Sequence, residues 1–357
     1  MNELNVDTST HSYSITIGDG IRHRLKDFIT KKYSSILVIT DDHVASLYLD
    51  DIIHALKGER IIPATIPSGE GSKSIEYYYK LQTIAMENQL DRQSLIIALG
   101  GGVVGDLAGF VAATFMRGID YIQVPTTILA HDSSVGGKVA INHELGKNMI
   151  GNFYPPQAVV YDVHTVRSLP EHEIRSGYAE LIKEAFIRDE SFLKELLSIN
   201  VQDVPNNQLI KHLYSGIQIK ADIVEKDEKE SSIRQFLNLG HTLAHALEAE
   251  LGYGKITHGE AVAIGILFAL QVSEDKFKPS LPYSAFYHWL KRNGYPLSLF
   301  NVEIKHLIKL MKLDKKATYK QVQMVLLRNI ADPVVVELSD KELEFALQSF
   351  KKELNAT

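Results

Sequence analysis

The stretch that decides the fold reads Ala98-Leu99-Gly100-Gly101-Gly102-Val103-Val104-Gly105-Asp106-Leu107. An apolar strand, Ser94 to Leu99, precedes the glycines, and apolar residues at helical spacing follow them. Glycine accepts a positive φ and lets the backbone approach a ligand closely, because it has no Cβ. A glycine-rich turn into a helix N-terminus also directs free N–H groups at an anion. The stretch therefore predicts a phosphate or dinucleotide cradle. Its spacing is neither the G-x-G-x-x-G fingerprint nor a P-loop, so a tight turn that only packs remains the alternative.

Composition limits the classes of protein to consider. The chain has 357 residues, of which 45% are hydrophobic and 23% charged, as is typical of a globular protein with two domains. Its net charge of −6 argues against nucleic acid as the main partner. Because the chain has no cysteine, any metal must be held by His, Asp or Glu.

Two features bear on location. Residues 1–7 contain no apolar core of the kind found in a signal peptide. The longest apolar stretch, Leu95 to Met116, is interrupted by glycines and by Asp106, which argues against a membrane span. We therefore expect a cytoplasmic protein with no membrane partner.

The two halves of the chain differ in pattern. In the first half, apolar runs alternate with helical segments, which is typical of a mostly parallel sheet covered by helices. The predicted strands are residues 13–17, 35–40, 61–66, 94–99, 121–124 and 159–162, with a helix at 77–88. After Pro170 the predicted helices are residues 173–188, 207–225, 238–251, 259–276 and 283–293, followed by a β patch at 322–327 and a helix capped by Ser339. We predict an α/β protein: a Rossmann-like, mostly parallel sheet domain at 1–170 and a mainly α-helical domain at 171–357.

Candidate metal ligands occur in the second half. His241 and His245 lie four residues apart on one face of a predicted helix, and H-x-x-x-H is a metal-ligand spacing. Thr242 stands where metalloproteases have a Glu, and core histidines bonded to the backbone are an equally good interpretation. Glu180 and Lys183 lie three apart on an otherwise apolar helix, which indicates either a site or an exposed ion pair. From these residues alone, the expected ligands are His241, His245 and one carboxylate.

Several short stretches are informative when they are considered together and in order. The second half contains Leu237-Asn238-Leu239-Gly240-His241-Thr242 and His258-Gly259-Glu260-Ala261-Val262, and the first contains Asp132-Ser133-Ser134-Val135-Gly136-Gly137-Lys138. The others are residues 68–74, 100–106, 115–118, 123–127, 146–148 and 176–180. In this order they resemble the 3-dehydroquinate synthase family of sugar-phosphate cyclases over nearly the whole chain. That family commonly has one residue more between Thr127 and Asp132 than this chain has.

The resemblance changes the set of metal ligands that we expect. It implies a fold in which the first domain binds NAD and the second binds a metal. In the family the zinc ligands fall at the positions of Glu180, His241 and His258, and His245 lies near the substrate. Three protein ligands leave coordination positions for substrate oxygens. Zinc is the implied metal, with Co²⁺ as its substitute.

The resemblance also implies a reaction, the conversion of 3-deoxy-D-arabino-heptulosonate 7-phosphate to 3-dehydroquinate and phosphate in the shikimate route to aromatic amino acids. NAD removes a hydride at C5, which acidifies the C6 proton, and phosphate then leaves by β-elimination. The hydride returns, and the ring opens and recloses by an intramolecular aldol step. Because NAD would be regenerated, the resemblance implies a carbon–oxygen lyase. The substrate's own phosphate is the expected proton acceptor in the elimination.

The implied substrate is a sugar-phosphate acid, so cationic groups are expected around it. The resemblance places near it Lys138, Asn148, Lys183, Lys220, Arg234, Asn238 and His245. Arg117 is expected to reach the phosphate from the neighbouring subunit of a homodimer. Either Lys315 or Lys316 joins them, and Lys316 is favoured. Taken singly, each lysine could equally be a solvated surface charge.

For NAD, the backbone of Gly101, Gly102 and Val103 is expected to hold the pyrophosphate. The adenosine end is assigned to Asp41, Glu70 and Lys73, and a carboxylate at a strand end disfavours NADP. The site is completed by Asp106, Thr126, Thr127, Asp132, Lys138, Lys147 and Ser168. A helix N-cap is the alternative role for Asp106.

Three rival functions remain to be separated. A glycerol-dehydrogenase-like alcohol dehydrogenase would share the architecture and accumulate NADH. Other sugar-phosphate cyclases act on substrates without a carboxylate, and Arg234, Asn238 and His245 match the quinate-type pattern instead. An NAD-binding sensor without catalysis is disfavoured, because the implied metal ligands and Lys138 are all present.

Overall fold

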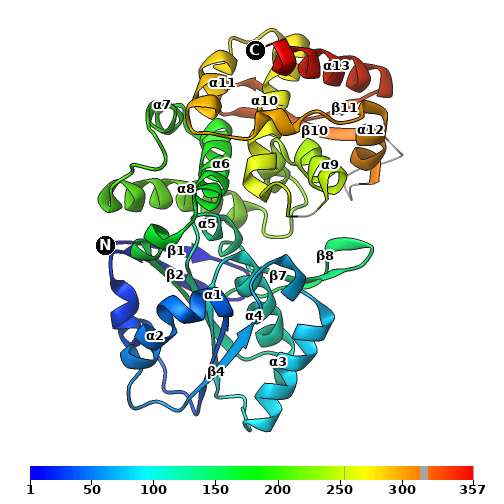
Figure 1. Ribbon diagram of the computed structural model, residues 1–357. Helices are drawn as coiled ribbons and strands as arrows, with labels where there is room; N and C mark the ends of the chain where they lie inside the picture. Colours follow the sequence, from blue (N-terminus) through cyan, green and yellow to red (C-terminus); the bar gives the residue numbers. More distant parts are fainter. Residues whose placement is uncertain (253, 314–320, 357) are drawn as a thin grey trace. The chain divides into compact units, whose positions relative to one another are not determined.

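The computed structural model describes residues 1–252, 254–313 and 321–356 (Figure 1). Its contacts divide the chain into two compact units. The first unit comprises Met1–Leu169 and Pro205–Glu228, and the second comprises Pro170–Val204 and Lys229–Thr357. Helix α8 (Asn206–Lys226) therefore groups with the first unit, although it follows residue 170 in the chain.

The first unit is built on a seven-stranded sheet of order β1-β2-β9-β6-β5-β3-β4. The strands are β1 (Asn2–Asp7), β2 (Ser12–Gly18), β3 (Ile36–Asp41), β4 (Ile61–Ile66), β5 (Leu95–Gly100), β6 (Asp120–Pro125) and β9 (Ala158–Asp162). β1 and β2 pair antiparallel, and the remaining pairs of this sheet are parallel. The predicted α/β fold with a mostly parallel sheet is confirmed, and β1 is the strand that the sequence did not predict.

Both faces of this sheet are covered, which explains why its inner strands are continuous apolar runs. Leu37 and Ile39 of β3 pack on the side of α3 and α4, and Ile36 and Val38 pack on the side of η1 and α2. The covering helices are α3 (Ile75–Glu87), α4 (Gly102–Thr114), η1 (Ile21–Phe28) and α2 (Asp50–Ala55). Figure 1 shows α2 and α3 on opposite sides of the sheet.

The glycine-rich turn joins β5 to α4, as the sequence predicts, and the helix begins at Gly102. None of the four glycines of the stretch has a positive φ, so backbone freedom is not what they contribute. They contribute space. A Cβ on Gly100 would lie 2.7 Å from the Val104 side chain, and one on Gly101 would lie 3.0 Å from Thr127 Cγ2. The N–H groups of the first helical turn have no partner within the helix and are open to an anion.

A hairpin that the sequence did not predict lies between β6 and β9. It consists of β7 (Lys138–His143) and β8 (Gly146–Phe153), which pair antiparallel as a separate two-stranded sheet. β8 is exposed or half-buried along its whole length, so it has no buried face to produce an alternating apolar pattern. The hairpin carries three of the expected site residues, Lys138, Lys147 and Asn148.

The second unit is mainly helical, as predicted. Its helices are α6 (Glu171–Arg188), α7 (Glu190–Ser198), α9 (His241–Leu251), α10 (His258–Phe277), α11 (Tyr283–Arg292), α12 (Ile304–Leu313) and α13 (Asp340–Ala356). The predicted β patch is β10 (Val322–Asn329), and it pairs antiparallel with β11 (Asp332–Leu338), which the sequence did not predict. Shorter segments of the chain are α1 (Asp42–Val44), η2 (Ala45–Leu49), η3 (Glu70–Ser72), η4 (Phe115–Arg117), α5 (Ala130–Ser133), η5 (Val163–Ser168), η6 (Ile233–Asn238) and η7 (Leu297–Leu299).

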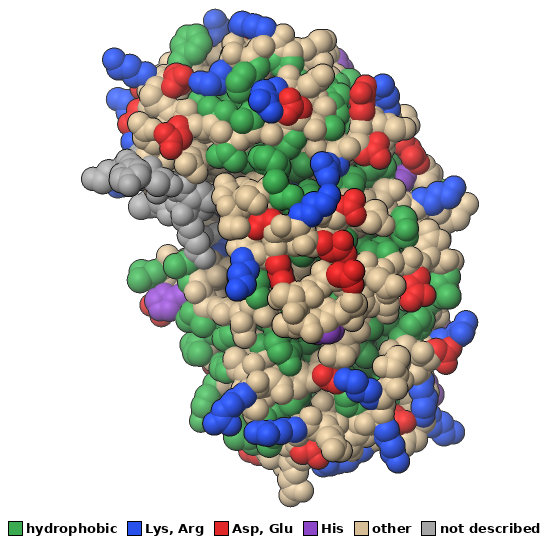
Figure 2. Space-filling view, turned by 180° about the vertical axis from the view of Figure 1, so that it is seen from behind, with side chains coloured by type: hydrophobic (Ala, Val, Ile, Leu, Met, Phe, Trp, Pro, Cys, Tyr) green, Lys and Arg blue, Asp and Glu red, His purple; other side chains and the backbone are tan. Residues whose placement is uncertain are grey.

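The predicted cap of the last helix is confirmed. Ser339 donates to Glu342 Oε2 from its N–H at 2.8 Å and from its hydroxyl at 2.7 Å, and Glu342 N donates back to Ser339 Oγ. Among the helices that the structure describes, none is both long enough and apolar enough to cross a membrane. On the face drawn in Figure 2, basic and acidic side chains are intermixed.

Candidate functional site

Three helices of the second unit bring together Glu180, His241 and His258. Glu180 lies within α6, and the two histidines are the first residues of α9 and α10. One potential ligand atom of each lies within 4.8 Å of the others. Glu180 Oε1 is 3.6 Å from His241 Nε2 and 3.6 Å from His258 Nε2. These separations suit a shared metal, since ligands about 2.1 Å from a tetrahedral ion lie about 3.4 Å apart.

The second heteroatom of each of these side chains already has a protein partner. The partners are Lys183 on Glu180 Oε2, the Leu239 carbonyl at 3.3 Å from His241 Nδ1, and Glu248 Oε2 at 3.0 Å from His258 Nδ1. A proton on Nδ1 leaves the lone pair on Nε2. Glu180 Oε1 is buried and has no hydrogen-bond partner among the described residues. One carboxylate oxygen and two imidazole nitrogens are thus directed at one point, which fits a divalent metal such as zinc.

Close packing of α10 on α6 sets the position of His258. The N–H of the next residue, Gly259, donates to Ser176 Oγ at 3.0 Å. A Cβ on Gly259 would lie 1.9 Å from the Ser176 carbonyl oxygen, so only glycine fits there. Glu260 completes a capping box at the start of α10 and accepts from Arg175 Nε at 2.9 Å. These contacts hold the first turn of α10 against the helix that carries the candidate carboxylate ligand.

Glycines also set the position of His241. Gly240, the residue before it, has a φ of 84°, and a Cβ there would lie 2.8 Å from Val262 O and Ile266 N of α10. A Cβ on Gly265 would lie 2.0 Å from the Gly240 carbonyl oxygen. The start of α9 and the middle of α10 can approach this closely because glycine occupies both positions.

His245 is near these residues but belongs to a different group. Its ring centroid lies 5.5 Å from that of His241 and 5.8 Å from that of His258. In the described part of the chain, its candidate metal group is His245, Glu248 and His258, without Glu180 or His241. The pair His241 and His245 that spacing alone favours does not occur together in either group.

Glu248 is the residue that the sequence interpretation missed. Its side chain is only 7% exposed and lies against the Nδ1 side of His258. His241, His245 and Glu248 follow the i, i+4, i+7 spacing of one helix face. This extended spacing, rather than the histidine pair alone, is the sequence signal that could have indicated it.

Cationic and amide groups expected near the substrate also lie in the second unit. Lys183 and Arg234 are 1% and 2% exposed, which is rare for cations and typical of groups with a specific partner. Asn238 Nδ2 donates to Glu230 Oε1 at 2.9 Å. Lys315 and Lys316 lie outside the described residues.

In the first unit, Lys73 lies among several of the expected cofactor residues. Its ammonium contacts the carboxylate of Asp106 and Oδ1 of Asn148. Burial raises the pKa of Asp106, and the charge of Lys73 opposes that shift. Asp106 lies inside α4, whose N-cap is Gly101, so the alternative N-cap role for Asp106 is wrong.

The loop that carries Glu70 is tied to the β7–β8 hairpin. Glu70 Oε1 accepts from Asn142 Nδ2 at 2.7 Å, and Asn142 Oδ1 accepts from Asn148 N at 2.9 Å. Lys138 is exposed at the start of the same hairpin, and Lys147 is half-buried. The hairpin therefore gathers residues that the sequence places far from Glu70 and Lys73.

A second contact in this unit joins α5 to α8. Lys220 Nζ lies 2.8 Å from Asp132 Oδ2 and also donates to the Asp132 carbonyl.

Thr126 Oγ1 is buried and has no hydrogen-bond partner within the described residues, whereas Thr127 Oγ1 accepts from Ala130 N at 3.3 Å. Thr126 adjoins the glycine-rich turn, because its N–H donates to the Gly100 carbonyl at 3.0 Å.

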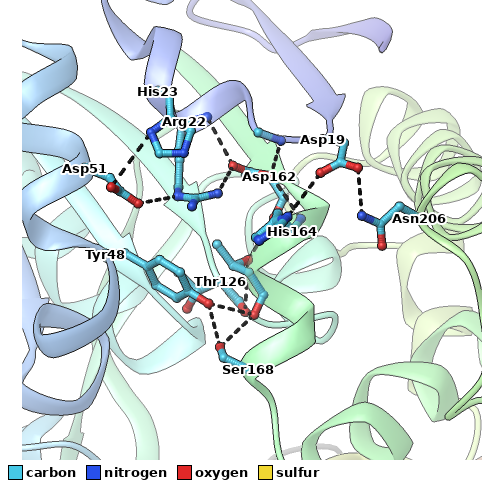
Figure 3. A network of polar contacts seen from close by, with 12 residues as sticks. Asp19, Arg22, His23, Tyr48, Asp51, Thr126, Asp162, His164, Ser168 and Asn206 are labelled. Carbon is cyan, nitrogen blue, oxygen red and sulfur yellow. Dashed lines mark hydrogen bonds and ion pairs between the residues drawn. The ribbon is translucent and has the colours of Figure 1, made fainter.

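Figure 3 shows the polar network around Ser168. Ser168 Oγ donates to the Thr165 carbonyl at 2.8 Å and accepts from Tyr48 OH at 2.7 Å. Nearby, the fully buried Asp162 accepts from Arg22 Nη1 at 2.8 Å. The network links η1 and η2 to the segment after β9, so the fold itself fixes the place of Ser168.

Local turns place three further residues. Asp41 caps α1 by accepting from Val44 N at 2.8 Å, and burial raises its pKa. Arg117 is exposed and has a φ of 71° in the turn after α4. His131 is fully buried, with Nδ1 at 2.6 Å from the Ile128 carbonyl, which is a local contact within the segment between Thr127 and Asp132.

Known proteins match nearly the whole chain. The sequence model of the 3-dehydroquinate synthase N-terminal region matches residues 63–176, and that of the C-terminal region matches residues 177–317. The chain is 58% identical over 352 residues to a 3-dehydroquinate synthase of Oceanobacillus iheyensis, with 98% of each chain covered.

Solved structures share the fold. A 2-deoxy-scyllo-inosose synthase in complex with carbaglucose-6-phosphate, NAD⁺ and Co²⁺ gives a TM-score of 0.89 at 25% identity, covering 98% of this chain and 100% of that one. A 2-epi-5-epi-valiolone synthase of Streptomyces hygroscopicus with NAD⁺ and Zn²⁺ bound gives a TM-score of 0.83 at 20% identity, covering 97% and 99%.

Proposed function

The chain belongs to the 3-dehydroquinate synthase family, and from this we propose that it converts 3-deoxy-D-arabino-heptulosonate 7-phosphate into 3-dehydroquinate and phosphate. We place this reaction in the cytoplasm, as a step of aromatic amino acid biosynthesis. The observation that carries the proposal is the group formed by Glu180, His241 and His258, whose candidate ligand atoms all lie within 4.8 Å of one another.

These three residues would hold a divalent metal, zinc in our proposal, with Co²⁺ as its substitute. Bound there, the metal supplies Lewis acidity toward the hydroxyl and carbonyl oxygens of the substrate. Lys183 occupies Glu180 Oε2, so the carboxylate offers Oε1 alone. The buried ammonium also neutralises the carboxylate before any ion is present, which limits the cost of burying that charge.

The first unit would hold NAD. The N–H groups of Gly101, Gly102 and Val103, at the start of α4, would bind its pyrophosphate. Bound NAD supplies a hydride acceptor that returns the hydride within the same turnover. The remaining contacts are proposed for Asp41, Glu70, Lys73, Asp106, Thr126, Thr127, Asp132, Lys138, Lys147 and Ser168.

The substrate carries a carboxylate and a phosphate, and cations would bind both. Arg234, buried and always charged, can engage a carboxylate through two parallel N–H donors. The proposed substrate residues are Lys138, Asn148, Lys183, Lys220, Arg234, Asn238, His245 and Lys316. The substrate's phosphate would accept the proton in the elimination, so no enzyme base is assigned to that step. In a homodimer, Arg117 would reach the substrate phosphate held by the partner subunit.

A phosphate-release assay tests the function. Purified protein is mixed with the heptulosonate phosphate, catalytic NAD and zinc, beside a sample treated with a chelator. We expect phosphate and 3-dehydroquinate in equal amounts, no lasting NADH absorbance, and loss of activity on chelation that added zinc restores. NADH accumulating from glycerol without phosphate release would instead identify an alcohol dehydrogenase. Turnover of glucose 6-phosphate or sedoheptulose 7-phosphate in place of the acid would identify a different cyclase.

A further inference from the structure

Glu248 is not one of the three candidate ligands Glu180, His241 and His258, but its carboxylate contacts the ring of His258. Glu248 Oε2 is 3.0 Å from His258 Nδ1, on the opposite side of the ring from the Nε2 atom that lies 3.6 Å from Glu180 Oε1. A carboxylate in this place accepts the Nδ1 proton and so fixes the lone pair on Nε2. We infer that Glu248 is the positioning residue of the metal site. The inference rests on the proposed function, which assigns a metal to Glu180, His241 and His258.

The two histidines differ in what supports them. His241 Nδ1 faces a neutral partner, the Leu239 carbonyl, at 3.3 Å, whereas His258 Nδ1 faces a buried carboxylate at 3.0 Å. Hydrogen bonds to ionised acceptors are shorter and stronger than neutral ones. The His258 side chain is also more exposed, at 33% against 12% for His241. His258 is therefore the ligand whose ring orientation and basicity depend most on a neighbouring charge.

Helix α9 supplies this support by its geometry. It begins with His241 and carries Glu248 two turns later on the same face, close to the start of α10 at His258. One helix thus provides one ligand directly and orients another through Glu248. The side chain of Glu248 is only 7% exposed, so water competes little for its carboxylate.

The alternative is that Glu248 is itself a ligand, in the group His245, Glu248 and His258. We favour the positioning role for two reasons. The Glu248 oxygen lies at hydrogen-bond distance from His258 Nδ1, whereas Oε1 of Glu180 is buried without a hydrogen-bond partner among the described residues. The experiment below separates the two roles.

The test measures zinc affinity directly, without activity. Metal-free wild type, Glu248→Ala and Glu248→Gln are titrated with zinc against a chromophoric chelator. Glu250→Gln is the matched control, because Glu250 lies on the same helix and contacts His306 instead. We expect Glu248→Ala to bind one zinc about 10- to 100-fold more weakly. Glu248→Gln should fall between, since its amide oxygen still accepts the Nδ1 proton but carries no charge, and Glu250→Gln should match wild type.

A second readout uses the absorption bands of bound Co²⁺. The positioning role predicts bands that are shifted but retained in Glu248→Ala. Wild-type affinity in both Glu248 variants would overturn the inference. Loss of all metal from Glu248→Ala, as in a Glu180→Ala control, would make Glu248 a ligand and also overturn it. Wild-type protein that binds no zinc would instead refute the metal assignment of the proposed function. If Glu248→Ala fails to fold, the nearly isosteric Glu248→Gln still tests the inference. Zinc affinity in Glu248→Gln equal to that of wild type would show that the charge of Glu248 does not support the site, and would overturn the inference.

Discussion

At the scale of single residues, the candidate metal site depends on which atom of each side chain already has a protein partner. His241 and His245 have the spacing of a ligand pair, but tertiary packing places Glu180 of α6 beside His241, whereas His245 groups with Glu248 of its own helix and with His258. A helix repeat places residues on one face and does not say which neighbouring helix meets that face. The decisive neighbour here is α10, whose first residue is His258.

The first prediction concerns metal content. His241→Ala and His258→Ala should each lose stoichiometric zinc, because each removes one of three candidate ligands. His245→Ala, which removes a ring only 5.5 Å from that of His241, should keep it. Elemental analysis of dialysed protein measures this. Equal zinc in the His258→Ala variant and wild type would contradict the assignment.

The second prediction concerns the buried pair of Lys73 and Asp106. Lys73→Met leaves a buried carboxylate without its cation, so the pKa of Asp106 rises further and stability falls by about 3–5 kcal/mol. NAD binding should weaken in parallel. Urea unfolding and NAD titration measure the two effects, with the exposed Lys80→Met on α3 as control.

A double variant then tests the cause. Lys73→Met combined with Asp106→Leu removes both charges and should recover most of the lost stability. If the double variant is as unstable as the sum of the two single variants, the pair is not the source of the loss.

At the scale of elements, glycines decide how closely helices approach. The third prediction is that Gly259→Ala destabilises the protein by about 1–3 kcal/mol or more. The added Cβ would lie 1.9 Å from a backbone oxygen of α6, so α10 must move away, and zinc affinity should fall with it. Gly71→Ala is the control, because nothing lies within 4 Å of a Cβ there. Thermal melting and zinc titration of both variants provide the comparison.

The fourth prediction concerns the cap of α13 and its dependence on pH. Hydrogen bonds from Ser339 lower the pKa of Glu342 from 4.5 to about 2. A lowered pKa in the folded state means that the carboxylate stabilises the fold above pH 4.5 and loses this effect as the pH falls toward 2. Glu342→Gln should therefore be less stable than wild type at pH 7, with a gap that narrows below pH 4.5. Urea midpoints at pH 7 and 3.5 measure the gap, and Glu344→Gln on the same helix should show no such narrowing.

Most elements could be predicted from the sequence because they bury a face. The inner strands of the sheet and helices such as α6 and α10 show apolar periods that packing confirms. The β7–β8 hairpin could not be predicted, since β8 buries little and its residues lack alternation. Glu248 was missed for a different reason: a buried acid on a helix becomes meaningful only when its neighbour from another helix is known.

At the scale of the whole molecule, neither of the two units is one continuous segment of the chain. Helix α8 returns to the first unit after α6 and α7, and it brings Lys220 to Asp132. A sequence pattern indicates where helices occur but not which sheet they pack against. The predicted division at residue 170 therefore places Lys220 and Asp132 in different domains, although they form an ion pair within the first unit.

The fifth prediction concerns the proposed homodimer. Arg117→Ala and His258→Ala should each be nearly inactive alone. Mixed after unfolding and refolding together, they should recover about a quarter of wild-type phosphate release, because half of the dimers are mixed and each mixed dimer has one intact site. If Arg117 acts within its own chain, no mixture regains activity, and that result would refute the shared site.

The contacts that join the start of α10 to Ser176 and Arg175 of α6 also bear on how the proposed metal would bind. Gly259 and Glu260 join the start of α10 to α6 by hydrogen bonds between protein groups, so a metal would not be needed to bring His258 and Glu180 together. Metal binding at the proposed site would then be a step separate from folding, unlike a zinc finger, where binding and folding are one reaction. A metal would therefore be able to leave the proposed site and return to it without the chain passing through an unfolded state.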